Sequence, residues 1–167
     1  MSMREITTFP AKVLHQKGEQ IETFDKDLQV LVEDMIQTMR DAPGVGLAAP
    51  QIGLSKRLIV VEFGDEQDED IPKQLYVLAN PEIIEKVGEQ VAGIEGCLSV
   101  PGLVGEVERA NIVTVQGQDQ YGKKVKIRAQ GWLARIFQHE IDHVNGILYT
   151  DRTDKIWQID EEEMDSM

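Results

Sequence analysis

The sequence predicts an α+β fold in which a helix, a run of mostly antiparallel strands and a second helix follow one another. Two segments, 26–40 and 132–144, carry apolar residues at helical spacing. Between them, residues 57–129 consist of short β-branched segments separated by turn residues. Strands that follow one another without intervening helices pair mainly antiparallel. The length of 167 residues suits one domain, 1–167, with a short acidic tail at about 158–167.

The composition excludes several classes of protein. An apolar content of 41% with 28% charged residues is typical of a folded globular chain. The net charge of −13 argues against direct DNA binding and against anionic membranes as partners. No apolar run approaches the roughly 18 residues of a membrane span, and the N-terminus lacks a signal-peptide core. A cytoplasmic protein is expected, although a mature organellar chain would look the same. Two acidic runs, 65–70 and 160–166, are expected to be solvated surface.

The first helix is predicted from its capping signals as well as its spacing. Asp25 is a plausible N-cap, and the sequence DAPG at 41–44 ends the helix. The segment GVGLAAPQIG at 44–53 has no charge and many small residues, which favours a loop whose backbone approaches another group closely.

The β region is predicted from alternation and β-branched residues. Turns are expected at Asn80–Pro81 and Tyr121–Gly122. The predicted strands are 57–63, 75–80, 82–87, 105–110, 111–118 and 124–129.

The second helix contains the sequence QHEIDH at 138–143, and Asn145–Gly146 provides its C-terminal stop. Residues four apart lie on one helix face, so His139 and His143 can bind one metal ion, as in the H-E-x-x-H pattern of metallohydrolases. At about 100° per residue, Glu140 falls within a mostly apolar arc, which makes it the candidate base. Asp142 falls on the other side, as a surface group or as support for a ligand.

A catalytic site of this type usually takes a third protein ligand. No histidine follows His143, and no later acid is marked as a ligand. The single cysteine, Cys97, lies in EGCLSVPG and offers a thiolate suited to Fe(II) or Zn. Taken alone, a lone cysteine is as often a core residue, but beside H-E-x-x-H it becomes the favoured third ligand.

The segments GVGLAAPQIG, EGCLSVPG and QHEIDH, in this order, resemble the three motifs of peptide deformylases. All three motifs are complete, and they span residues 44–143. The resemblance implies an α+β fold in which mixed, mostly antiparallel sheets surround a central H-E-x-x-H helix. It also implies removal of the formyl group from the N-terminal formylmethionine of newly made polypeptides, with release of formate.

The resemblance further implies the roles of the site residues. Cys97, His139 and His143 would bind one divalent metal, Fe(II) by family habit, with Zn, Ni or Co as substitutes. A water on that metal would attack the formyl carbon, and Glu140 would act as general base and then as general acid. The side chain of Gln51 and the backbone N–H of Leu98 would donate to the developing oxyanion.

The substrate-binding residues are less specific predictions. Trp132, Ile136 and Val45 are candidates for an apolar slot that takes the methionine, although ordinary core packing is the alternative. Gly46 and Gly96 would leave backbone groups open to the peptide. Three further side chains have less definite roles. Gln138 either supports a ligand or is solvated, and Arg109 either pairs with a buried carboxylate or lies on the surface. His15 is expected to be unrelated to the site.

The expected partners are N-formylmethionyl nascent peptides at the ribosome, with no membrane and with the chain as a monomer. The acidic tail lacks the basic amphipathic helix that would dock on a ribosome. Two other functions remain open. One is a different metallohydrolase, such as a peptidase or deacylase, and the other is a non-catalytic metal-binding or peptide-binding protein.

Overall fold

The computed structural model describes residues 3–64 and 72–159. The two acidic runs predicted to be surface, 65–70 and 160–166, lie outside the described residues. The chain forms the elements η1 (Lys12–His15), α1 (Lys26–Asp41), β1 (Gly46–Ala48), η2 (Ala49–Ile52), β2 (Leu58–Phe63), β3 (Gln74–Cys97), β4 (Val100–Gln118), β5 (Lys124–Gln130), α2 (Trp132–Val144), η3 (Tyr149–Asp151) and β6 (Ile156–Gln158). The predicted order of helix, strands and helix is confirmed.

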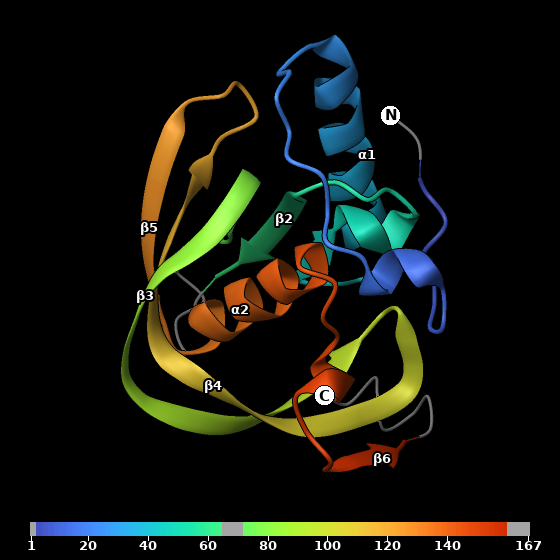
Figure 1. The fold of residues 1–167 in the computed structure, drawn as a ribbon, viewed down its shortest axis with the longest axis vertical. Helices are drawn as coiled ribbons and strands as arrows, with labels where there is room; N and C mark the ends of the chain where they lie inside the picture. The colour runs from blue at the N-terminus through green and yellow to red at the C-terminus, as the bar shows by residue number, and fades with distance from the viewer. Residues whose placement is uncertain (1–2, 65–71, 160–167) are drawn as a thin grey trace.

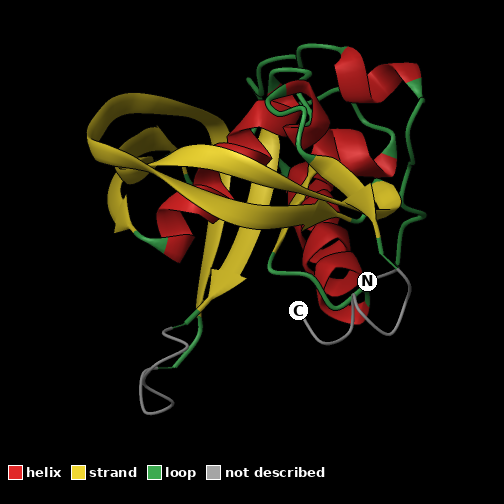
Figure 2. Ribbon diagram, turned by 90° about the horizontal axis from the view of Figure 1, so that it is seen from below, coloured by secondary structure: helices red, strands yellow, loops and turns green. Residues whose placement is uncertain are grey.

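The strands form one antiparallel sheet in the order β1-β2-β3-β4-β5, and β6 pairs with β4 beside this path. The β3–β4 hairpin is long and curves around α2 (Figure 1). Seen from below, strands cross α2 while α1 stands at one end of them (Figure 2). The sheet therefore wraps the helix that carries the two histidines, and the expected α+β fold is confirmed.

The strand boundaries differ from the prediction in β3 and β4. The predicted strands 75–80 and 82–87 are parts of one strand, and no turn separates them at Asn80–Pro81. Asn80 has a φ of 53°, and the register shifts between Ala79 and Glu82. Asparagine tolerates this left-handed conformation, and a bulge absorbs the extra residue without ending the strand. The predicted strands 105–110 and 111–118 likewise merge into β4.

The segment 44–53 is more regular than the predicted loop. Residues Gly46–Ala48 form β1, which pairs with β2, and Ala49–Ile52 form a short 3-10 helix. The pairing with β2 overrides the weak strand propensity of small residues, because burial between neighbouring elements decides strand formation more than propensity does. The segment therefore enters the core instead of lying over it.

Helix α1 follows the prediction closely. The Asp25 side chain accepts a hydrogen bond from the Leu28 N–H at 3.0 Å, which is the expected N-cap. The apolar face buries Leu31, Val32 and Met35 in a cluster with residues of β1 and β2. The opposite face is exposed, as in an ordinary amphipathic helix.

Helix α2 has the predicted bounds, 132–144, and Gly146 follows its end with a φ of 78°. Phe137, Ile141 and Val144 join the main core beneath the sheet. This helix also buries five polar side chains, whereas α1 buries two, Asp34 and Thr38. Within residues 3–64 and 72–159, neither helix has the length and hydropathy of a membrane span.

Candidate active site

The three predicted metal ligands lie together where the end of β3 meets α2. Cys97, His139 and His143 offer donor atoms that all lie within 4.8 Å of one another. The Cys97 Sγ lies 3.3 Å from His143 Nε2, and the two histidine rings have centroids 5.0 Å apart. The four-residue spacing stacks the histidines a turn apart, and the last residue of β3 brings the sulfur to them.

This donor set fits a divalent metal ion. His139 uses Nδ1 in a 2.8 Å hydrogen bond with Glu95 Oε1, which leaves its Nε2 available to a metal. Burial lowers the pKa of His143 well below its ordinary value, so this ring is neutral near pH 7, the form that binds metals. One sulfur and two imidazoles make three protein ligands, which is the number typical of a catalytic site with one open position.

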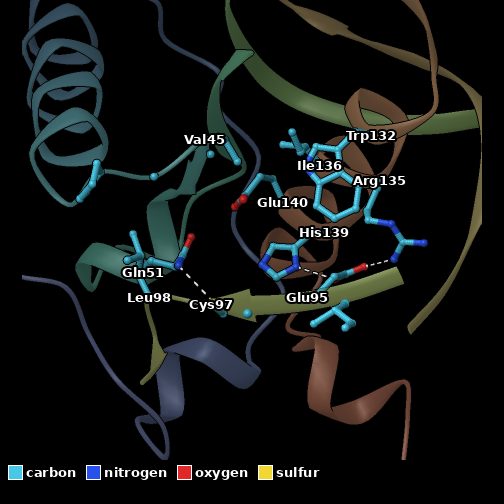
Figure 3. Close-up of a pocket in the computed structure, with 15 residues that line it drawn as sticks. Val45, Gln51, Glu95, Cys97, Leu98, Trp132, Arg135, Ile136, His139 and Glu140 are labelled. Carbon is cyan, nitrogen blue, oxygen red and sulfur yellow. Dashed lines mark hydrogen bonds and ion pairs between the residues drawn. The ribbon is translucent and has the colours of Figure 1, made fainter. Parts of the chain in front are cut away.

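Glu95 holds His139 in place. The sequence patterns did not identify Glu95 as a site residue. Its carboxylate accepts hydrogen bonds from Arg109 at 2.9 Å. It also contacts Arg135 at 2.6 Å and His139 at 2.8 Å (Figure 3). Burial alone would raise the pKa of Glu95, but hydrogen bonds from Arg109 and His139 hold it well below its usual range. Strand alternation offers a signal, because residues 95 and 97 of one strand share a face.

A second carboxylate continues this network. Asp142 accepts hydrogen bonds from Arg109 at 2.6 Å and from Arg152 at 2.7 Å. Asp142 is 6% exposed and Arg109 is 4% exposed, so the surface interpretation of both residues is wrong. Burial of these charges is tolerated because each has an opposite charge at hydrogen-bond distance.

Gln138 is 3% exposed, so it is not solvated. Its side chain accepts from the Ala110 N–H at 3.1 Å and donates to the Ala110 carbonyl at 2.8 Å. These hydrogen bonds of Gln138 link α2 to β4 and do not support a metal ligand. His15 contacts the ring of Phe9 at 5.7 Å and does not line the site.

Glu140 lies on the cleft side of α2, opposite Gly46. Its Oε1 is buried without a hydrogen-bond partner among the described residues. A Cβ at Gly46 would lie 2.5 Å from Glu140 Oε2, so only glycine leaves room for the carboxylate. Burial raises the pKa of Glu140 to about 7, while His139 opposes the shift. A carboxyl group with such a pKa can take up and release a proton near neutral pH.

Gln51 has a fixed orientation at the other side of the cleft. Its Oε1 accepts from the Ala48 N–H at 3.0 Å, and its Nε2 donates to Ser99 Oγ at 3.2 Å and Cys97 Sγ at 3.5 Å. The amide N–H group therefore faces the metal-ligand cluster (Figure 3).

A pocket opens beside these groups, between β1, the end of β3 and α2 (Figure 3). Trp132 and Val45 are about half exposed at its rim, whereas Ile136 is buried in its wall. All of the predicted substrate-binding residues line it, as do Glu140, Gln51 and Leu98; they are Val45, Gly46, Gly96, Trp132 and Ile136. Arg135, Glu95 and Ile94 line it too and were not predicted.

Comparison with known proteins places this geometry in one family. The family model of polypeptide deformylase matches residues 3–158. A peptide deformylase of Symbiobacterium thermophilum is 51% identical over 162 residues, covering 97% of this chain and 72% of the relative. Peptide deformylase 1 of Bacillus subtilis is 47% identical and covers 96% of each chain.

A solved structure agrees with the sequence relatives. The Met-Ala-Ser-bound class I type b peptide deformylase of Acinetobacter baumannii is 38% identical, with a TM-score of 0.84, over 92% of this chain and 100% of that one. The chain therefore belongs to the polypeptide deformylase family, metal-dependent hydrolases that remove the N-formyl group from nascent peptides.

Proposed function

We propose that this cleft carries out the family reaction with Cys97, His139 and His143 as metal ligands and Glu140 as the proton carrier. The observation that carries the proposal is the unpartnered Glu140 Oε1, buried in the same pocket as the three donor atoms. A relative with this fold is bound to Met-Ala-Ser, which is the product expected from formyl-Met-Ala-Ser. The substrate is accordingly an N-formylmethionyl peptide, and the products are formate and a free amino terminus.

Family habit favours Fe(II) as the ion, with Zn, Ni or Co as substitutes, and a thiolate with two imidazoles suits all of these ions. When bound, such an ion supplies Lewis acidity toward the formyl carbonyl and activates water as a nucleophile. The hydrogen bond that His139 Nδ1–H donates to Glu95 fixes the ring, so that Nε2 would be left to hold the ion. Arg109 and Arg135 keep Glu95 charged and in place.

Glu140 moves the proton in both halves of the reaction. It first accepts a proton from the attacking water, and a pKa of about 7 keeps a large share of the carboxyl group ionised for this step. The same carboxyl then donates that proton to the departing amine nitrogen. The tight fit against Gly46 holds the carboxylate toward the pocket during both transfers.

Gln51 and Leu98 stabilise the negative charge that forms on the formyl oxygen. The Ala48 N–H and Ser99 hold the Gln51 amide in place, and the N–H that now points to the Cys97 sulfur would donate to the oxyanion instead. The backbone N–H of Leu98 directly follows the cysteine and lines the same pocket. Donors fixed in advance stabilise a transition state without the cost of reorienting.

The methionine side chain enters the apolar part of the pocket formed by Val45, Trp132 and Ile136. The backbone of Gly46 and Gly96, one from each side of the cleft, binds the peptide chain. The setting we propose is a cytoplasmic monomer with one catalytic domain, 1–167, that meets its substrates as they leave the ribosome.

The test is anaerobic assay of formate release from formyl-Met-Ala-Ser by protein loaded with Fe(II), alongside the variant Glu140→Gln. The wild-type protein should release formate, and the variant should lose activity by about 10²-fold or more while keeping its metal, because glutamine keeps the shape but cannot accept the proton. If the metal-loaded wild-type protein released no formate, the proposal would be wrong.

A further inference from the structure

One edge of β3 is open beside the pocket. Residues Gln74 to Ala79 of β3 pair with β2 on one side, but the rest of the strand pairs only with β4. Among the described residues, no strand covers the other edge between residues 82 and 97. An open edge presents backbone donors and acceptors that can pair with another extended chain.

The pairing of β4 identifies which residues face this edge. The Glu106 N–H donates to the Lys155 carbonyl at 2.9 Å, so Glu106 points toward β6 and away from β3. Glu106 lies opposite Ile94, which therefore belongs to a pair without hydrogen bonds between β3 and β4. Backbone direction alternates along a strand, so Ala92, Ile94 and Gly96 all turn their N–H and C=O groups to the open edge.

This edge is continuous with the site. Gly96 and Ile94 line the pocket, and Ala92 is the next residue of the same direction, leading away from Cys97. Ile94 is 43% exposed and Val91 is 47% exposed, so apolar side chains accompany the open backbone. The regular ladder stops at a register shift between Val87 and Gln90. From Gly96 to Ala92 the edge measures about 13 Å at roughly 3.3 Å per residue.

We infer that this edge binds the part of the substrate that follows the first three residues, as an added antiparallel strand. The inference rests on the proposed function. A formyl group held at Cys97 directs the peptide chain against the direction of β3, which is the orientation of an antiparallel pair. Gly96 and Ile94 both line the pocket already described, and the added contacts are the backbone groups of Ile94 and Ala92. Only every second residue of an extended peptide turns its backbone groups to the edge, so each contact accounts for two substrate residues. The contacts therefore extend to about the sixth residue.

The charge of this region favours a polypeptide substrate over a second copy of this chain. Glu82, Glu85 and Glu89 are exposed on the same strand, where Lys86 is the one exposed cation, and the net charge of the chain is −13. Two such edges would bring like charges together, which opposes edge-to-edge pairing. A nascent chain without acidic residues meets no such repulsion. The protein is thereby adapted to polypeptides of six or more residues rather than to formylated di- and tripeptides.

The first test measures kcat/KM for formyl-Met peptides of three to nine residues, and then for a nine-residue peptide N-methylated at one position at a time. We expect kcat/KM to rise up to about six residues and to level off. Methylation beyond the third residue should lower it by roughly three- to tenfold at alternate positions only, because each lost N–H breaks one hydrogen bond. Equal kcat/KM for all lengths, or equal losses at neighbouring positions, would overturn the inference.

The second test uses Ala92→Pro, which removes an N–H that faces the open edge and takes no part in the pairing with β4. Ala92→Val, which keeps the N–H, is the matched control. Proline should abolish the advantage of long peptides while leaving formyl-Met-Ala-Ser turnover unchanged, and valine should preserve both. A proline variant that keeps the full length advantage would contradict the inference. Turnover of the tripeptide without any length dependence would refute the extended edge alone, whereas no turnover of any peptide would refute the proposed function.

Discussion

The two helices of this protein bury polar side chains to very different degrees. Helix α1 buries an apolar face together with Asp34 and Thr38, and it exposes its outer side, where Val30 is 46% exposed. Helix α2 buries Arg135, Gln138 and Asp142 together with its apolar residues. The sequences of both helices have strong apolar periodicity, so periodicity alone does not distinguish them.

The difference shows what each helix is for. Specific partners on β3, β4 and the segment after the helix hold the polar residues of α2. One of these partners, Glu95 on β3, also holds His139. Burying a charge is costly unless it is paired, so such a network persists where it positions functional groups. Helix α1 also buries two polar side chains, Asp34 and Thr38, which Arg4 contacts, but no residue of this helix lines the pocket. The following experiments test whether this contrast holds.

The largest effect on stability is expected for Arg109→Met. The change leaves Glu95 and Asp142 buried with fewer partners, and loss of one member of a buried ion pair costs about 3–5 kcal/mol. Urea unfolding measures the loss of free energy of unfolding. Arg128→Met, whose side chain is 63% exposed, is the control and should change little. A loss below about 1 kcal/mol for Arg109→Met would remove the contrast between the helices.

Gly46→Ala should act on activity more than on stability. The added Cβ overlaps the Glu140 carboxylate, which must then turn from the cleft. We expect kcat to fall by about 10²-fold, the lower end of what a positioned proton carrier contributes. Formate assays give kcat, while urea unfolding and metal analysis show whether the fold and the ion are retained. Unchanged kcat would mean that the position of the carboxylate is not critical.

On α1, Asp25→Ala removes the N-cap hydrogen bond to the Leu28 N–H. The expected loss is about 1 kcal/mol in the free energy of unfolding, with kcat unchanged, because this helix contributes no group to the cleft. Asp25→Asn, which can still cap, should retain most of the stability. A change of kcat in the alanine variant would show that α1 is coupled to the site.

The smallest effect is expected for the ion pair of Arg40 on α1 with Glu62 on β2, 2.7 Å apart. The hydrogen bond from Arg40 lowers the pKa of Glu62 below its ordinary value. A lowered folded-state pKa stabilises above the unfolded-state value of about 4.5, and this stabilisation is lost as the pH falls through the folded-state value. Unfolding between pH 6 and pH 3 should therefore differ slightly between the wild-type protein and Glu62→Gln, with the difference shrinking on acidification. A difference that grew on acidification would mean that folding raises the pKa of Glu62 instead of lowering it.

Much of the site could be predicted from short-range spacing. The pair His139 and His143 follows from helical geometry, and the inward position of Glu140 follows from its apolar arc. The pocket residues required the family resemblance as well. What could not be predicted depends on contacts between distant segments. The partners of Arg109 lie 14 and 33 residues away, so no local pattern identifies them.

The fold was predicted less well where a local signal was overridden. Asn80–Pro81 is a typical turn sequence, yet the Asn80 side chain hydrogen-bonds both backbone groups of Ile21, 59 residues away. That contact fixes the residue in a bulge within a continuous strand. The loop predicted for 44–53 became β1 for a similar reason, since β2 supplies its partner.

The distance along the chain between the proposed ligands has a consequence for folding. Cys97 precedes His139 by 42 residues (139 − 97), and the span between them includes all of β4 and β5. An ion held by both residues closes this length of chain into a loop, and so reduces the conformational freedom of the unfolded polypeptide as a cross-link would. Such a cross-link can be removed by a chelator and restored by adding metal. An ion held by Cys97 and His139 would thus be a reversible cross-link within the sheet, besides its part in the reaction.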